Sequence, residues 1–278
     1  MSNDITFSEG FLFSGKDLFL DKNVIVKHPS VENILDITKD ETSFDIYWNM
    51  VNTLMCDPYT HMVMLDDLGI DYEKVDAFDV FVLKWKDLVK QYKDDKQKFD
   101  LLGIKPLYNA LVSLNFFLGQ HNFELRPLEN EFGELETVLC DTNSIEDGIC
   151  YYMITRNMFN RMAEFICSIH HIDKSDQIHP ENDNFKKMLI DDMRDELKSK
   201  SKKKQDTKNT FGEYIGKIMK ATCSCGNGGI SVFNVNDVKI YQLLSGFNMF
   251  VKKNSVDRLF NGQYDLSKLN QKELNWFD

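Results

Sequence analysis

The chain has 278 residues and a net charge of −11, because 44 Asp and Glu outnumber 33 Lys and Arg. This length allows one or two domains with a buried core, and the acidic balance argues against a protein that binds the phosphate backbone of nucleic acids. No apolar run approaches the roughly 20 residues of a membrane-spanning helix, and the first ten residues lack the basic and apolar regions of a secretory signal.

The N-terminal segment alternates short apolar runs with turn residues, which is typical of β-strands. Apolar runs at 11–13, 18–20 and 24–26 predict a small hairpin or a three-stranded meander. Ser30 follows and is placed to cap a helix over residues 31–35.

Helical periodicity dominates the next stretch of the chain. A helix is predicted from Phe44 to Met55, ending before Pro58, and a short second helix is predicted to stop at Gly69. Asp76 can cap a third helix, which carries one long apolar stripe. Since the connections are short, we expect these helices to pack as antiparallel neighbours.

The pattern changes after the polar residues 93–98. Residues 107–118 fit either a helix or a strand, whereas 123–125, 137–139 and 149–153 are typical of short strands around an acidic loop. This part of the chain is therefore predicted to be a small β insertion.

Helices are predicted again in the last part of the chain. Apolar stripes at 158–169, 185–193 and 211–219 each repeat at helical spacing. Asn236 can cap a longer helix over residues 238–251, and short helical pieces are predicted at 256–277. The second stripe continues into the Lys-rich residues 198–208, which we interpret as a solvated loop.

These patterns together predict an α+β fold that is mainly α-helical. The expected organisation is an N-terminal β-hairpin plus helical unit at 1–99, a small β insertion at 100–153, and a C-terminal helical unit at 154–278 with the Lys-rich loop 198–208.

The cysteines predict neither a disulfide framework nor a metal site. They are scattered through the chain, at Cys56, Cys140, Cys150, Cys167, Cys223 and Cys225. Without the spacing of a small secreted protein, they are interpreted as reduced cytosolic thiols, several of them in the core. Cys223 and Cys225 lack the second Cys pair of a structural zinc site, so their loop is interpreted as inert.

The histidines and the glycine-rich turn are likewise interpreted as structural. His170 and His171 are adjacent on a helix, so they cannot easily share a metal, and we interpret them as cations at a helix C-terminus. His179 is expected in a loop and His61 on a polar helix face. Residues 226–229 lack the Lys of a phosphate-binding loop and predict a turn.

Charged clusters are interpreted as solvated surface. Neighbouring carboxylates occur at Asp66-Asp67, Asp94-Asp95 and Asp191-Asp192, and adjacency alone does not make an acid–base pair. The Lys-rich residues 198–208 could contact nucleic acid or an acidic partner, but they lack interleaved aromatic side chains. We therefore expect no catalytic residues, no cofactor and no metal site.

Two groups of residues carry a resemblance to known proteins. They are Asn23–Ser30, Tyr47-Trp48, Cys56–Pro58, Met64–Tyr72 and Phe78–Phe81, together with the C-terminal run Ser255–Trp276. These residues resemble proteins of tailed bacteriophages of low-GC Gram-positive bacteria that are encoded among tail morphogenesis genes. The resemblance implies a tail assembly or tail structural component, and it transfers no catalytic residue.

The expected function is therefore non-enzymatic and lies in virion tail assembly. The protein would act as a chaperone of a long helical tail component such as the tape measure protein, or as a tail-associated structural subunit. Its expected partners are other phage tail proteins and a second copy of itself, in the host cytoplasm or the virion. Two alternatives stay open: a cytosolic regulatory or host-modulating binding protein that uses the Lys-rich loop and the β insertion, and an enzyme with an unrecognised site at Cys223 and Cys225.

Overall fold

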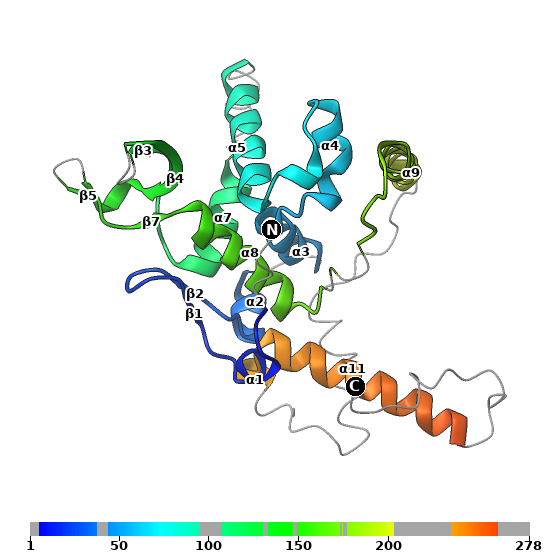
Figure 1. Cartoon of the computed structure of the whole chain (residues 1–278). Coiled ribbons are helices and arrows are strands. Elements are labelled where there is room, and N and C mark those ends of the chain that lie inside the picture. The colour runs from blue at the N-terminus through cyan, green and yellow to red at the C-terminus, as the bar shows by residue number, and fades with distance from the viewer. Residues whose placement is uncertain are drawn as a thin grey trace.

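The computed structural model describes residues 6–37, 44–94, 107–129, 133–146, 149–172, 174, 177–202 and 235–260. In these ranges the fold is α+β and mainly α-helical, which confirms the predicted fold class. Three helices meet at the centre of the molecule: α3 (Phe44–Met55), α7 (Tyr108–Leu118) and α8 (Arg156–Ile169) (Figure 1). The long helix α5 (Ala77–Asp94) packs against α8.

The N-terminal segment contains one hairpin and one short helix. Strands β1 (Leu18–Phe19) and β2 (Ile25–Val26) pair antiparallel, which confirms the predicted hairpin. The third predicted strand, at 11–13, is wrong because these residues belong to helix α1 (Glu9–Phe13). The Ser8 side chain accepts a hydrogen bond from the backbone N–H of Phe11 and so caps α1.

Helix α2 (Val31–Ile37) begins at the predicted cap. The Ser30 hydroxyl accepts from the backbone N–H of Asn33 at 3.2 Å, and the Asn33 side-chain oxygen accepts from the backbone N–H of Ser30 at 3.0 Å. This reciprocal pair satisfies two backbone donors at the helix start.

The second and third predicted helices also have the expected ends. Helix α4 (Met62–Asp67) ends at Gly69, which has a φ of +70° that a glycine adopts without strain. The Asp76 carboxylate accepts from the backbone N–H of Asp79 at 2.9 Å and caps α5. Short 3₁₀ turns precede α4 and α5, at η1 (Tyr59–His61) and η2 (Tyr72–Lys74).

The middle of the chain combines one core helix with small antiparallel sheets. The ambiguous residues 107–118 form α7, and the two strands expected next are present but longer than predicted. The sheet order is β3-β4-β7, with β3 (Phe123–Glu129), β4 (Leu135–Asp141) and β7 (Met153–Ile154). A 3₁₀ turn, η3 (Thr142–Ser144), leads into a second hairpin of β5 (Ile145–Glu146) and β6 (Ile149–Cys150). The strand predicted at 149–153 is thus divided between β6 and β7.

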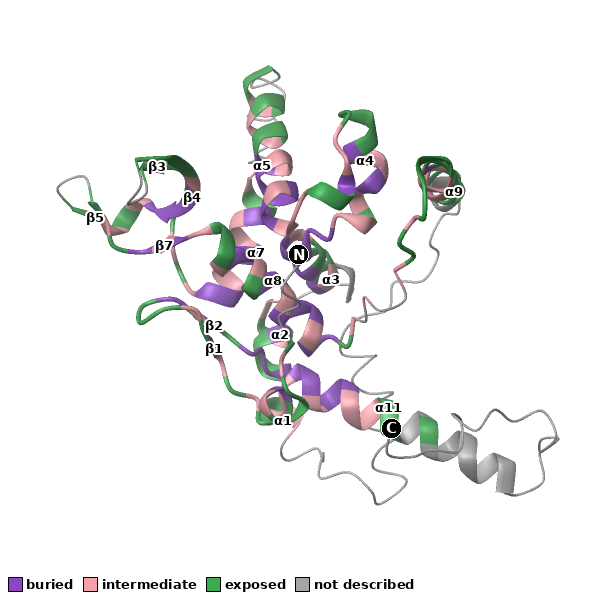
Figure 2. Cartoon of the chain, in the orientation of Figure 1, coloured by how far each residue is buried: buried purple, intermediate pink, exposed green. Residues whose placement is uncertain are grey.

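Buried side chains from all three predicted units form one hydrophobic core (Figure 2). Leu54 on α3, Leu114 on α7 and Phe165 on α8 are all fully buried within it. Helix α7 lies inside the segment expected to be a separate β insertion, yet it contributes to this shared core. The unit boundaries 1–99, 100–153 and 154–278 stay predictions.

The last described helix packs against the first one. Helix α11 (Ile240–Phe260) follows the 3₁₀ turn η4 (Val235–Asp237) and packs against α1. The predicted cap at Asn236 is wrong, because Asn236 lies in η4 and the Gln242 side-chain oxygen instead accepts from the backbone N–H of Lys239.

Helix α9 (Asp183–Lys202) lies apart from the central helices in Figure 1 and contacts α4. Residues 198–202, predicted as the start of the Lys-rich loop, continue this helix, so that part of the prediction is wrong. The hydrogen bond of the Ser199 hydroxyl to the Glu196 carbonyl and the Lys198–Asp195 ion pair support the last turns. Residues 203–208 lie outside the described residues.

Several other sequence predictions also fall outside the described part of the chain. They concern the helix at 211–219, the glycine-rich turn at 226–229, and Cys223 and Cys225. Within the described ranges, no helix combines the length and apolar character needed to cross a bilayer.

Candidate functional site

The described residues leave one large groove, of about 1050 Å³, between α3, α5, α7 and α9. Its apolar lining includes Ile46 and Met50 on α3, Tyr108 and Val112 on α7, and Met193 and Leu197 on α9. Uncharged amide side chains lie between these apolar groups, at Asn49, Asn52 and Asn109. Apolar walls with a few polar groups are typical of a binding site.

The spacing of the lining residues shows how helices create this groove. On α3, residues 46, 49, 50 and 53 line it, which are successive positions on one helix face. The neighbouring face of α3 places Tyr47, Val51 and Leu54 in the core. Helix α3 therefore packs into the core with one face and lines the groove with the neighbouring face.

Large apolar side chains along the groove are exposed to solvent. The exposed fractions are 39% for Ile46, 60% for Tyr108 and 48% for Leu197. These side chains come from three different helices and converge on one concavity, whereas single exposed apolar residues on a surface are common.

The α5 side of the groove is polar. The ammonium group of Lys84 lies 3.2 Å from Nε2 of His61, and both residues line the groove. His61 Nδ1 lies 2.9 Å from the carbonyl oxygen of Asp57, which can only accept, so Nδ1 carries the proton and Nε2 accepts from Lys84. Burial first, and then the charge of Lys84, lower the pKa of His61 and favour this neutral form.

Helix α9, which forms one wall, is held to the body by ion pairs. Arg194 binds Asp66 at 3.0 Å and Asp67 at 2.9 Å, both on α4. Lys186 binds Asp71, which caps η2, and Glu73 within η2.

These ion pairs add to the sequence interpretation of Asp66-Asp67 and Asp191-Asp192 as solvated surface. Asp66 and Asp67 are exposed as predicted, but both bind Arg194, which also binds Asp191 at 3.0 Å. Asp95 lies outside the described residues.

The predicted role of His170 is wrong. It is buried, its Nε2 lies 2.7 Å from the Tyr47 hydroxyl, and its Nδ1 lies 2.6 Å from the Ile166 carbonyl oxygen. Burial lowers the pKa of His170 to about 4, so at neutral pH it is not a cation at the helix end. Its neighbour His171 stacks on Tyr241 with ring centroids 4.4 Å apart, and burial also lowers its pKa.

The remaining predicted histidines lie where expected. His179 is an exposed loop residue that hydrogen-bonds to the hydroxyl of Tyr59. His61 lies in η1, immediately before α4, on the polar side of the groove described above.

A histidine that the sequence interpretation missed forms a pair with a carboxylate. His121 Nδ1 lies 2.9 Å from Asp141, whose other oxygen accepts from the backbone N–H groups of Asn122 and Asn143. These hydrogen bonds keep the Asp141 pKa low despite its burial, which opposes them. In the part of the chain described here, no hydroxyl or thiol hydrogen-bonds to the ring of His121. The pair therefore ties the turn after α7 to the end of β4.

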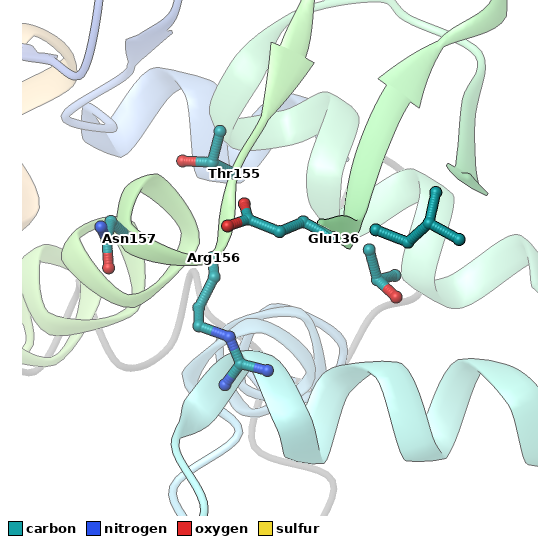
Figure 3. A pocket seen from close by; sticks show the side chains of 6 residues that line it. Glu136, Thr155, Arg156 and Asn157 are labelled. Carbon is teal, nitrogen blue, oxygen red and sulfur yellow. The ribbon is translucent and has the colours of Figure 1, made fainter. Parts of the chain in front are cut away.

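A smaller cavity of about 320 Å³ lies between β4 and the start of α8 (Figure 3). Glu136, Thr155, Arg156 and Asn157 line it. Figure 3 shows the Arg156 side chain extending away from Glu136, and its guanidinium group binds Asp79 on α5 at 2.6 Å. Arg156, which carries the positive charge of this cavity, is thus paired with Asp79 and joins α8 to α5.

Three of the four described cysteines behave as core residues, and the fourth, Cys150, is half-buried. Cys56, Cys140 and Cys167 are buried, as predicted, and burial raises the pKa of each thiol, to about 12, 12 and 11 respectively. Protonated thiols of this kind are poor nucleophiles and poor metal ligands. Within the described ranges, no three His, Cys, Asp or Glu side chains are arranged to hold a metal ion.

Comparison with known proteins returned no match. No protein-family model matches this chain, and neither does any curated protein or any solved structure.

Proposed function

We propose that this protein is a non-enzymatic bacteriophage protein of virion tail assembly, and that its groove receives an amphipathic helix of a long tail component. The observation that carries the proposal is the convergence of three helix faces, from α3, α7 and α9, on one apolar groove. An amphipathic helix in an apolar groove is a common mode of recognition, in which the apolar face of the helix is buried.

The size of the groove supports this occupant. Two turns of an α-helix, roughly 10–12 Å across and about 11 Å long, occupy about 850–1200 Å³. The groove offers about 1050 Å³. The groove therefore has room for about two turns of helix, and a long helical protein would contact it one segment at a time.

The resemblance to phage tail proteins supplies the biological setting of the proposal. A long tail component such as the tape measure protein exposes apolar helix faces before it is assembled, and such faces promote aggregation. A chaperone with a net charge of −11 would keep the complex soluble.

Co-expression with the long helical protein of the same tail gene cluster tests the proposal. We expect this protein to raise the soluble fraction of its partner. The double variant Ile46→Glu, Tyr108→Glu should abolish the effect, because it places two charges on exposed positions of the groove wall. Ile149→Glu is the matched control, since Ile149 is 58% exposed and does not line the groove.

The result that would overturn the proposal is equal solubilisation by the groove variant and the wild-type protein. Mass spectrometry of purified virions then separates the two roles within tail assembly, because a structural subunit stays in the particle and a chaperone does not. If the protein makes none of the tail proteins more soluble, the result would favour the cytosolic regulatory alternative.

A further inference from the structure

Among the described residues that line the groove, Lys84 is a cation without a carboxylate within ion-pair distance. Lys84 is partly buried on α5, and its hydrogen-bond partner within the described structure is the neutral ring of His61. No carboxylate in the described ranges lies within ion-pair distance of its ammonium group. This differs from Lys186 and Arg194, which each bind at least two carboxylates.

The hydrogen bond to His61 orients Lys84 without neutralising it. The Asp57 carbonyl keeps the proton on Nδ1 of His61, so Nε2 can accept from the ammonium group. An ammonium group has three donors, and this contact uses one of them. The charge and the other donors are available to a ligand in the groove.

We infer that Lys84 is a subsite for a carboxylate on the helix that occupies the groove. The inference rests on the proposed function, since it specifies the chemistry of the same partner. A helix that filled the groove would remove water from Lys84, and a desolvated cation without a counter-charge is costly. A Glu or Asp within the apolar face of the occupant would supply that charge.

The position of Lys84 fixes where this carboxylate lies. Lys84 lines the groove from α5, whereas α9 lines it with Met193, Glu196 and Leu197. The acidic position of the occupant is therefore directed towards α5. The partner is an amphipathic helix with an acidic residue at one position next to its apolar stripe.

Selection from a library of helical peptides tests this inference with the full-length protein. Each peptide has about 18 residues, with apolar residues at i, i+3, i+4 and i+7 and all other positions randomised. We expect the peptides that bind the wild-type protein to share Asp or Glu at one position. Replacing that residue by Gln or Asn should weaken binding about tenfold, which corresponds to about 1.4 kcal/mol, because the hydrogen bond to Lys84 loses its charged acceptor.

Variants of α5 show whether Lys84 is the group that binds the carboxylate of the peptide. In Lys84→Met the same acid-to-amide change should alter binding less than about twofold. Lys86→Met is the matched control, because Lys86 is exposed on the same helix and is not part of the groove lining. It should keep the tenfold effect. The unfolding midpoint of Lys84→Met serves to verify that the variant is folded.

The two failures are distinguishable. Loss of binding in the double variant Ile46→Glu, Tyr108→Glu shows that the selected peptides bind in the groove. If such peptides share no acidic position, the inferred role of Lys84 is wrong and the proposed function stands. An acid effect that persists in Lys84→Met also overturns the role of Lys84. If the groove variant binds every selected peptide like the wild type, both are wrong.

Discussion

Tyr47 and His170 are 123 positions apart in the chain and are joined in the core by a hydrogen bond of 2.7 Å. His170 Nδ1 is directed to the Ile166 carbonyl oxygen, which leaves Nε2 to accept the proton of the Tyr47 hydroxyl. The contact connects α3 to the end of α8 and sets the protonation state of a fully buried imidazole.

Tyr47→Phe should lower the free energy of unfolding by about 1–3 kcal/mol, because Nε2 of His170 would be left buried without a donor. Urea denaturation measures the loss. Tyr151→Phe is the matched control, because Tyr151 is 58% exposed, and it should change stability by less than about 0.5 kcal/mol. Equal stability of the two variants would contradict the hydrogen bond.

The protein should lose stability between pH 6.5 and pH 4. Burial is the largest cause that lowers the pKa of both His28 and His170 from 6.5 to about 4. In this window the unfolded chain takes up protons that the folded state does not bind, so stability is complete above about pH 6.5 and falls as the pH approaches 4. By pH 4.5 the loss should reach about 2–3 kcal/mol for each histidine.

His28→Leu tests the acid sensitivity directly. Both ring nitrogens of His28 are buried without a hydrogen-bond partner in the described structure. An apolar side chain of similar size should therefore be tolerated at pH 7 and should reduce the acid loss by about half. Urea denaturation at pH 7.5 and pH 4.5 gives the comparison. An unchanged pH dependence would show that His28 does not contribute.

Asn160→Ala should destabilise the contact between α5 and α8. The Asn160 side-chain oxygen accepts from the backbone N–H of Phe78 at 3.0 Å, and its amide group donates to Asp76 at 2.8 Å. The variant leaves a backbone donor in the first turn of α5 without its partner, so we expect a loss of about 1–2 kcal/mol. Asn157→Ala, at an exposed position of the same helix, should cost little. Similar losses in thermal unfolding would contradict this role.

The position of α9 should depend on salt. Lys186 and Arg194 hold this helix to α4 and η2, and ion pairs at partly exposed positions weaken as ionic strength rises. Arg194→Ala, or 1 M salt, should speed hydrogen exchange of the α9 amides about two- to fivefold. Lys187→Ala removes a charge from an exposed position of α9 and should leave exchange unchanged. Unchanged exchange in Arg194→Ala would show that packing alone holds α9.

Local signals predicted the ends of helices well. Ser30, Gly69 and Asp76 act within three residues of their own position, so their roles can be read from neighbouring residues. The apolar run at 11–13 predicts a strand, but these residues belong to helix α1, which begins earlier, after its cap at Ser8. Residues 107–118 were ambiguous since α7 carries apolar side chains on most of its faces.

The groove could not be predicted from the sequence. His61 and Lys84 are 23 positions apart, and only the packing of η1 beside α5 brings them together. On α3 the groove face combines Ile46 and Met50 with Asn49 and Thr53, and a mixed face of this kind is equally typical of the solvent side of a helix. His170 was misinterpreted for a similar reason, because its burial depends on Tyr47, a distant residue.

The strand-like contact between residues 29–31 and 238–240 has a consequence for synthesis. The Val31 N–H donates to the Val238 carbonyl at 2.9 Å, and the Ile240 N–H donates to the Pro29 carbonyl at 3.0 Å. A ribosome must therefore translate the chain through Ile240 before the start of α2 can make these bonds. A nascent chain that stops short of Val238 leaves the Val31 N–H without its carbonyl partner, so the segment before α2 completes its packing late in synthesis.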